Sequence, residues 1–216
     1  MKKRYTHVIW DFNGTLYNDV EACIQSAKRL LRAHGLSPIA SVEAYREIFG
    51  FPIIDYYRRM GFDFEKTPYS ELAVEWVDYY LEASREATVY PEAIALLEAL
   101  RARGLSQILL SATEERMLQN QLASLGLSNA FDEVIGQDNI HAYGKEALGR
   151  AWRARNPEAE VLFLGDTEHD AAVAAEMGAD CILLSCGHQS SARLKACRPL
   201  ATLADHRLVL SHFGQL

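Results

Sequence analysis

The sequence predicts an α/β fold, in which a doubly wound parallel sheet carries an inserted helical segment. Short apolar runs alternate with helical patterns along most of the chain, and this alternation is typical of a parallel sheet covered by helices on both faces. One long stretch near the N-terminus breaks the alternation, because it contains helical patterns only. These two observations define the predicted architecture.

Five apolar runs are expected to form the buried strands of the sheet. Each run is short and stops abruptly at a polar residue or a glycine, which is typical of a buried strand. The runs cover residues 8–10, 108–110, 133–135, 161–164 and 181–184. Residues 200–210 are expected to add a last strand or helix that closes the sheet.

Helical patterns separate these strands. Pro91 occupies a favourable first helical position and Gly104 stands just past the end of the same pattern, which predicts a helix over residues 91–103. Further helices are predicted over residues 114–125, 143–155 and 168–177.

The stretch from about residue 18 to residue 88 is predicted to be a separate helical domain. Its helical patterns cover residues 20–34, 42–49, 53–60 and 69–87. We therefore expect an α/β core domain made of residues 1–17 plus 89–216, and a helical domain made of residues 18–88. Aromatic residues of the helical domain, such as Trp76, recur at helical spacing and are expected to form its own core.

Composition and charge exclude several classes of protein. The 216-residue chain has a net charge of −7 and no basic run, which argues against a nucleic-acid partner. No stretch approaches the ~20 apolar residues of a membrane span, and no signal peptide is recognised. Four cysteines without C-x-x-C spacing favour reduced thiols, so we expect a cytoplasmic protein. The sequence gives no prediction of oligomeric state.

Polar residues follow three of the predicted strands at the point where each strand ends. Asp11 follows the first strand, Ser111 the second and Asp166 the fourth. Ligands of an open parallel sheet bind at the carboxyl ends of its strands. We therefore expect these three residues to converge at one edge, although they are far apart in the sequence.

The segment Asp11-Phe12-Asn13-Gly14-Thr15 supplies a carboxylate at a strand end. Such a carboxylate can serve as a nucleophile or a metal ligand, and Gly14 allows the chain to turn tightly against a ligand. The same residues are also ordinary turn chemistry, so this segment alone does not indicate a site.

Two further segments can bind an anion. Ser111, Ala112 and Thr113 are expected to open a helix, where a hydroxyl and backbone N–H groups suit a phosphate. Thr113 alternatively serves as the N-cap of that helix. Lys145 opens the next predicted helix, where a cation opposes the helix dipole, so it is expected to neutralise charge between a carboxylate and a phosphate.

Asp166 and Asp170 follow the most apolar strand and stand four residues apart, on one face of the predicted helix. Two carboxylates at a strand end suit Mg²⁺, which takes hard oxygen ligands from protein and keeps several waters. Helix capping by Asp166 or Thr167 explains one acidic residue well and two less well.

Taken in order, these four segments resemble the motifs of the haloacid dehalogenase-like (HAD) hydrolase superfamily, over nearly the whole chain. The inserted helices resemble the C1-type cap of that family. The segments Val173–Gly178 and Ser185–Ser190 make the phosphoglycolate phosphatase-like members the most similar. The resemblance implies a Rossmann-like core with a helical cap over residues 18–88.

The resemblance also implies a Mg²⁺-dependent phosphatase that hydrolyses a small phosphorylated metabolite, such as a phosphoglycolate-like monoester. Asp11 would attack phosphorus and form an aspartyl-phosphate. Mg²⁺ would be held by Asp11, by the backbone carbonyl of Asn13 and by Asp166, and Asp170 would support these ligands. Ser111, with Ala112, Thr113 and Lys145 beside it, would bind the phosphoryl oxygens.

Asn13 departs from the phosphatase pattern, which has a second aspartate at this position as general acid and base. An amide does neither at neutral pH, and losing such a group typically costs ~10²- to 10⁴-fold in rate. Three consequences are open: slow hydrolysis, a substrate with a good leaving group such as an acyl or aryl phosphate, or a replacement acid. His169 and Glu115 are the candidates for that acid.

Other functions compete with phosphatase activity. Asn13 also fits a catalytically weak HAD-fold protein that binds a phosphometabolite or a partner protein. A dehalogenase-type relative would form an ester with carbon and need no metal. A phosphonatase-type relative would need a cap lysine, and only Lys28 and Lys66 are candidates.

The helical segment also offers side chains that could contact the substrate. An anionic substrate tail could bind the cations available there, which are Arg46, Arg58, Arg59 and Lys66. His188, in the loop after the last core strand, could contact the substrate or the cap, although a loop histidine is usually exposed.

Overall fold

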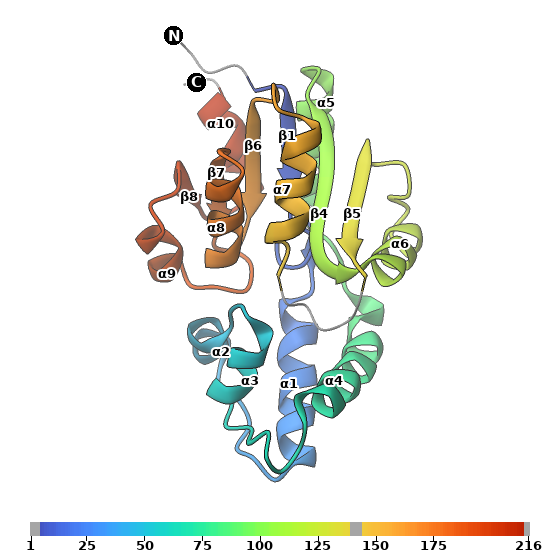
Figure 1. Cartoon of the computed structure of the whole chain (residues 1–216), viewed down its shortest axis with the longest axis vertical. Coiled ribbons are helices and arrows are strands. Elements are labelled where there is room, and N and C mark those ends of the chain that lie inside the picture. Colours follow the sequence, from blue (N-terminus) through green and yellow to red (C-terminus); the bar gives the residue numbers. More distant parts are fainter. Residues whose placement is uncertain (1–4, 139–143, 214–216) are drawn as a thin grey trace.

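A six-stranded parallel sheet forms the centre of the structure, a computed structural model that describes residues 5–138 and 144–213. Its strands are β1 (His7–Trp10), β4 (Ser106–Glu114), β5 (Glu133–Gln137), β6 (Val161–Gly165), β7 (Asp180–Leu184) and β8 (Ala201–Leu203). The order across the sheet is β5-β4-β1-β6-β7-β8, so the sheet grows outward from β1 in both directions (Figure 1). The predicted doubly wound α/β fold is confirmed.

Both faces of the sheet are buried, which explains why its strands are short apolar runs. Side chains alternate along β1, so that Val8 and Trp10 join the hydrophobic cluster on one face and Ile9 joins the cluster on the other. The first face is covered by α5 (Pro91–Ala102), α6 (Glu115–Ser124) and α10 (Val209–Phe213). The second face is covered by α7 (Glu146–Arg155), α8 (Glu168–Glu176) and α9 (Ser191–Ala196).

Strand β4 differs from its prediction in a way that affects the site. It continues past Leu110 to Glu114, and its pairing with β5 is irregular between those two residues. Ser111, Ala112 and Thr113 therefore lie at the end of this strand, and Glu114 separates them from the helix that they are expected to open.

The start of α6 corrects a second prediction. Glu114, and not Thr113, is the N-cap, because the Glu114 carboxylate accepts hydrogen bonds from the backbone N–H groups of Arg116 and Met117 at 3.1 and 2.8 Å. The start predicted for the following helix, residue 143, lies outside the described residues. Within them α7 begins at Glu146, directly after Lys145.

Four α-helices fill the segment between residues 18 and 88, as predicted. They are α1 (Val20–Ala33), α2 (Val42–Ile48), α3 (Ile53–Arg59) and α4 (Tyr69–Ala83), followed by the short 3₁₀ helix η1 (Ser84–Glu86). Strands β2 (Tyr17–Asn18) and β3 (Thr88–Val89) pair antiparallel where the chain enters and leaves this helical layer. The layer lies beyond the carboxyl ends of the core strands (Figure 1).

The helical layer shares its hydrophobic cluster with one face of the sheet. Leu30, Tyr45 and Leu72 from the layer and Trp10 from β1 belong to a single cluster. The division into separate core and cap domains at residues 18 and 88 therefore stays a prediction.

The C-terminal segment contains both elements that the sequence left open. Strand β8 extends the sheet beside β7, and the 3₁₀ helix η2 (His206–Leu208) and α10 follow it. Among the described residues, no helix is long and apolar enough to cross a membrane.

A buried hydrogen bond between adjacent strands provides a test of this core. Trp10 Nε1 donates to Gln107 Oε1 at 2.7 Å, and both side chains are fully buried. We expect Gln107→Leu to lower the free energy of unfolding by about 1–3 kcal/mol, because it leaves the indole N–H without a partner. Urea denaturation measures the change. Gln25→Leu on the exposed face of α1 is the matched control, and equal effects of the two substitutions would contradict the prediction.

Candidate active site

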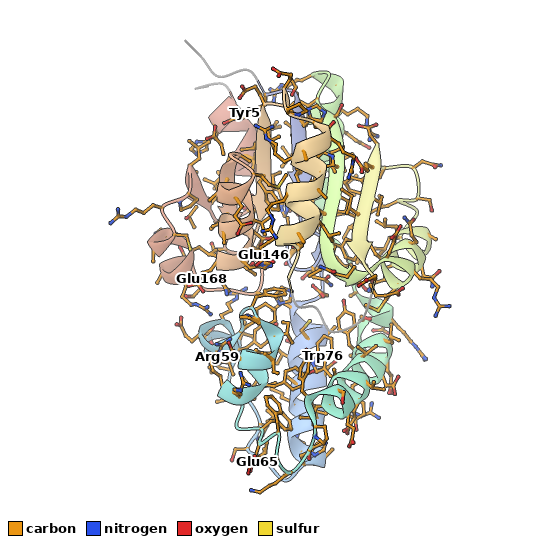
Figure 2. All side chains as sticks on the ribbon, viewed as in Figure 1. Tyr5, Arg59, Glu65, Trp76, Glu146 and Glu168 are labelled. Carbon is orange, nitrogen blue, oxygen red and sulfur yellow. The ribbon has the colours of Figure 1, made fainter. Side chains whose placement is uncertain are left out.

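Asp11, Ser111 and Asp166 meet at the carboxyl edge of the sheet, as the sequence predicts. Strand β1 lies between β4 and β6, with Trp10 in register with Leu109 and Leu164, so the residues that follow emerge side by side. All three are buried and line a cavity of about 50 Å³, which is also lined by Asn13, Phe49, Phe51, Ala112, Lys145, Thr167, Asp170 and His188. Glu146 and Glu168, which begin α7 and α8, mark this edge in Figure 2.

Lys145 is the cation of the site and is 2% exposed. Its Nζ forms ion pairs with Asp11 and, at 2.7 Å, with Asp170, and it donates to the Leu110 carbonyl at 3.0 Å. Burial opposes the charge of the ammonium group, but the two carboxylates outweigh burial and raise the pKa of Lys145 above its usual value. Lys145 therefore stays charged, and it holds Asp11 in a fixed position.

Asp170 connects the start of α8 to Lys145. Its Oδ2 accepts hydrogen bonds from the backbone N–H of Asp166 at 3.1 Å, and from the N–H and hydroxyl of Thr167 at 2.9 and 2.7 Å. Thr167 is the N-cap of α8, one of the two capping alternatives that the sequence offers. Burial disfavours the Asp170 carboxylate, but Lys145 and these hydrogen bonds lower its pKa. Asp170 thus remains a charged support for Lys145.

Asp166 packs tightly against two glycines. Its Oδ1 accepts from the hydroxyl of Thr15 at 3.1 Å, and its Oδ2 accepts from the backbone N–H of His188 at 2.6 Å. Gly14 has a φ of +73°, and a Cβ there would lie 2.3 Å from Asp166. A Cβ on Gly187 would lie 2.1 Å from the same carboxylate. Both positions require glycine for the loops to enclose Asp166.

The site carries more negative than positive charge. Carboxylate oxygens of Asp11, Asp166 and Asp170 lie within 4.8 Å of one another, and Lys145 is the only Lys or Arg that lines this cavity in the described part of the chain. Burial raises the pKa of Asp11 to about 6, with Lys145 opposing the rise. Burial, together with the charges of Asp11 and Asp170, raises the pKa of Asp166 well above its usual value. A divalent cation bound to hard oxygen ligands fits this excess, so the donor set suits Mg²⁺.

The amide of Asn13 is held by three neighbouring side chains. Its Nδ2 donates to Asp19 Oδ2 at 2.7 Å and to the Tyr80 hydroxyl at 2.9 Å. Its Oδ1 accepts from the Thr113 hydroxyl at 2.8 Å. The amide is thus oriented by groups from β4 and α4, and it presents no ionisable group to the cavity.

Asp19 is a site residue that sequence reasoning missed. It stands before α1, where an aspartate looks like an ordinary N-cap, yet its side chain makes no capping bond to that helix. Instead it accepts hydrogen bonds from Asn13, from the backbone N–H of Gly14 at 2.9 Å and from Tyr80 at 2.8 Å. Burial opposes its charge, but the charge of His188 and these hydrogen bonds lower the pKa of Asp19. Only the absence of a capping hydrogen bond from the backbone N–H groups of α1 distinguishes it from a cap, and that is not visible in the sequence.

His188 is buried, at 2% exposed, and the expectation of an exposed loop histidine is wrong. One ring nitrogen, Nε2, lies 3.2 Å from Asp19 Oδ1, and the other, Nδ1, lies 2.7 Å from the hydroxyl of Tyr45 on α2. Burial disfavours the charged ring, but Asp19 reverses this effect and raises the pKa of His188. The predicted contact between this loop and the helical layer is therefore present.

The two candidates for a replacement acid lie away from the Asn13 amide. His169 Nε2 is 3.2 Å from the backbone N–H of Lys145, and burial lowers the pKa of His169, so its neutral ring accepts that hydrogen bond. Glu115 is exposed on α6 and lines a different surface pocket. Neither residue lines the cavity around Asp11.

The four cations of the helical segment that are available to an anionic substrate tail have other partners. Arg46 donates to the carbonyls of Gly187 and Cys186 at 3.0 and 2.9 Å. Arg58 and Lys66 form ion pairs on the surface with Asp55 and Asp63, and Arg59 donates to the carbonyl of Ile48 at 2.6 Å. None of the four lines the cavity around Asp11.

Comparison with known proteins identifies relatives of the whole chain. A family model described as haloacid dehalogenase-like hydrolase matches residues 8–184. A phosphoglycolate phosphatase of Cereibacter sphaeroides is 28% identical over 216 residues, covering 97% of this chain and 94% of that protein. A phosphoglycolate phosphatase of Pseudomonas fluorescens is 28% identical over 193 residues, covering 84% of this chain and 70% of that protein.

Solved structures share the fold at lower identity. A haloacid dehalogenase-like family protein of Streptococcus pneumoniae superimposes with a TM-score of 0.82 at 21% identity, covering 97% of this chain and 98% of that one. A hydrolase of Pseudomonas syringae superimposes with a TM-score of 0.76 at 22% identity, covering 97% and 98%.

The contacts of Asn13 predict the effect of restoring an aspartate there. Asn13→Asp places a partly buried carboxylate beside the buried Asp19 and removes the amide donor, so we expect it to lower the free energy of unfolding by about 1–3 kcal/mol. The loss should be smaller near about pH 5 than near about pH 8, because a proton shared between the carboxylates relieves their repulsion.

The double substitution Asn13→Asp with Asp19→Asn keeps one carboxylate and one amide in the pair. We expect it to recover part of the lost stability, measured by thermal and urea denaturation at both pH values. The idea is wrong if the single variant is as stable as the wild type, or if the double variant shows the summed loss of the two single variants.

Proposed function

This chain belongs to the haloacid dehalogenase-like hydrolase family, and we propose that within the family it is a Mg²⁺-dependent phosphatase. Its substrate would be a monoester of a small phosphorylated metabolite, and its nucleophile would be Asp11. The observation that carries the proposal is the buried cluster of Asp11, Lys145, Asp166 and Asp170 at the carboxyl edge of the sheet. The names of the relatives make phosphoglycolate the first reference substrate.

Asp11 would react as a carboxylate. One of its oxygens forms a bond to phosphorus while the bond from phosphorus to the ester oxygen breaks, and the ester oxygen leaves with the bonding electrons. Water then hydrolyses the aspartyl-phosphate, which releases inorganic phosphate and restores Asp11. Lys145 supports this role, since its ion pair favours the ionised carboxylate against burial.

Lys145 and Ser111 would bind the transferring phosphoryl group. Both side chains are buried beside Asp11 and line the same small cavity. A fixed ammonium group in a site that excludes water stabilises the charge that builds up on phosphoryl oxygens. Ala112 lines this cavity too, whereas the Thr113 hydroxyl is engaged with Asn13.

Mg²⁺ would be held by carboxylate oxygens of Asp11 and Asp166 and by the backbone carbonyl of Asn13. When bound, the ion would neutralise negative charge on the phosphoryl oxygens and on the site's own carboxylates. Asp170 would serve as a support, because both of its oxygens already accept hydrogen bonds or pair with Lys145.

The helical segment of residues 18–88 would act as a cap that keeps water from the site. Phe49 and Phe51, which follow α2, line the cavity around Asp11. Arg46 and Tyr45 fasten α2 to the loop that contains Gly187 and His188. The cap and the core thus contact each other directly beside the reacting carboxylate.

A catalytically weak binding protein is the second candidate, and Asn13 is the observation that favours it. The amide has no proton to give to a leaving group, and its hydrogen bonds are satisfied within the protein. A phosphonatase-type reaction has less support, since neither Lys28 nor Lys66 lines the site cavity.

Turnover of acetyl phosphate and phenyl phosphate separates the two candidates. We expect Mg²⁺-dependent release of inorganic phosphate, and we expect Asp11→Asn to reduce it by at least ~10³-fold because the nucleophile is lost. Asp78→Asn, an exposed position on α4, is the matched control and should retain wild-type activity. Absence of turnover, with Asp11→Asn indistinguishable from wild type, would favour the binding protein.

Mg²⁺ binding is expected to stabilise the fold independently of activity. At about 100 times its Kd, a ligand that binds only the folded state adds about 3 kcal/mol, so the Tm should rise by several degrees. Asp166→Asn should abolish the rise, because it removes a proposed ligand, whereas Asp78→Asn should preserve it. Differential scanning calorimetry with and without MgCl₂ measures the shift. An equal shift in Asp166→Asn would place the ion elsewhere.

A further inference from the structure

A second cavity, of about 130 Å³, lies next to the cavity that contains Asp11. The two share five wall residues, which are Asn13, Phe49, Phe51, Ala112 and His188. Asn13 stands where the two cavities meet, two residues after the proposed nucleophile. A substrate with phosphorus at Asp11 would therefore extend its leaving group past Asn13 into the second cavity.

The wall of the second cavity is largely aromatic. Besides Phe49 and Phe51, it includes Tyr56, Tyr57, Tyr69, Trp76 and Tyr80 from α3 and α4. The rings of Trp76 and Tyr80 are stacked, with centroids 4.9 Å apart. Figure 2 shows Trp76 within the helical layer that faces the sheet edge. An apolar cavity of about 150 Å³ in an engineered protein binds benzene, so this space suits a single aromatic ring.

The charges around the second cavity oppose a leaving group that carries a carboxylate of its own. Among the described residues that line it there is no lysine or arginine, whereas Asp19 and Glu114 both line it. Arg193 contacts the backbone of Phe49 but does not line this cavity. It donates to the Phe49 carbonyl at 2.6 Å and pairs with Glu168. A carboxylate such as that of a glycolate leaving group would meet only His188 as a cation among the described wall residues, and the ring of His188 is already paired with Asp19.

Two polar groups of the wall lack a partner within the described part of the chain. They are the hydroxyl of Tyr56, which is 3% exposed, and the indole Nε1 of Trp76. Both can donate a hydrogen bond. Neither donor is satisfied by the described residues, so each is available to an oxygen of a bound molecule that reaches it.

The chemistry of Asn13 supports the same leaving group. An amide cannot protonate the departing oxygen, so the leaving group must carry negative charge with little help. A phenol has a pKa of about 10, as in tyrosine, far below that of an aliphatic alcohol, which is closer to the value of about 15.7 for water. Phenolate oxygen therefore departs more easily without an acid.

We propose that this protein hydrolyses a phosphate monoester whose leaving group is a single aromatic ring, a phenyl-type phosphate, with the ring held among Tyr56, Trp76 and Tyr80. The proposal rests on the phosphatase function proposed above. Asp11 gains the bond to phosphorus, the phenolate leaves with the electrons of the broken bond, and water completes the hydrolysis to phenol and inorganic phosphate. Phosphoglycolate is then a poor substrate.

A comparison of benzyl phosphate with ethyl phosphate tests the cavity separately from leaving-group chemistry. Both esters have aliphatic alcohol leaving groups, but only one has a ring. We expect kcat/KM to be at least ~10-fold higher for benzyl phosphate, because its ring is removed from water in the cavity. Phenyl phosphate should exceed both, and phosphoglycolate should fall to the level of ethyl phosphate or below.

Substitution of Ala73 tests whether the preference for benzyl phosphate over ethyl phosphate arises in the second cavity. Ala73 is buried on α4, lines the second cavity and does not line the first. Ala73→Leu fills the space, so we expect the ratio of kcat/KM for benzyl over ethyl phosphate to fall toward one. The ratio is insensitive to general damage, which affects both substrates alike. Val74→Leu, half-exposed on the same helix, is the matched control and should retain the wild-type ratio.

Direct binding of 4-nitrophenol, followed by quenching of tryptophan fluorescence, gives a readout that does not need turnover. We expect saturable quenching in the wild type and weaker quenching in Ala73→Leu. If no phosphate ester is hydrolysed but 4-nitrophenol binds in this way, the phosphatase function fails and the aromatic site survives. If esters are hydrolysed with a benzyl-to-ethyl ratio near one, or if phosphoglycolate is the best substrate, the aromatic leaving group is overturned while the phosphatase function stands.

Discussion

The burial of three carboxylates beside one ammonium group is the constraint on which the rest of the site depends. Asp11, Asp166 and Asp170 lie within 4.8 Å of one another, and Lys145 pairs with two of them. Removing these charges from water is costly unless opposite charge and hydrogen bonds compensate it. The loops around the site supply such hydrogen bonds. Helix α8 begins with a capping box that uses Asp170, and glycines 14 and 187 allow the backbone to enclose Asp166. The remaining excess of negative charge is what suits the edge of this sheet to a divalent cation.

Asn13 connects this charged cluster to the helical layer. Its amide bonds to Asp19 before α1, to Tyr80 on α4 and to Thr113 on β4, so one side chain joins the two layers of the molecule. An aspartate in its place would face the carboxylate of Asp19. Asparagine in place of aspartate at position 13 is therefore consistent with the neighbouring side chains, because Asp19 already supplies the negative charge that pairs with His188.

The two cavities and the amide give one consistent description of a substrate. The cavity at Asp11 is small and charged, which suits a phosphoryl group, and its neighbour is aromatic, with no lysine or arginine among its described wall residues. The aromatic residues thus have two roles, because side chains that pack in the hydrophobic cluster of the helical layer also form the wall of the second cavity. Both features favour the same class of substrate, a phenyl-type phosphate. Its phenolate departs without a general acid, and its ring fits the second cavity.

The sequence by itself determined the fold class, the positions of five core strands and the convergence of Asp11, Ser111 and Asp166, because these depend on local periodicity and on the geometry of parallel sheets. It also indicated Lys145 and Asp170 as candidate site residues, because both stand near the start of a predicted helix. Tertiary structure alone decided which partners the side chains take. Asp19 and His188 are 169 residues apart, and no local pattern distinguishes their buried contact from an N-cap and an exposed loop. The aromatic cavity likewise depends on the packing of α3 and α4 over the end of β4, and long-range packing leaves no periodic signal in the sequence.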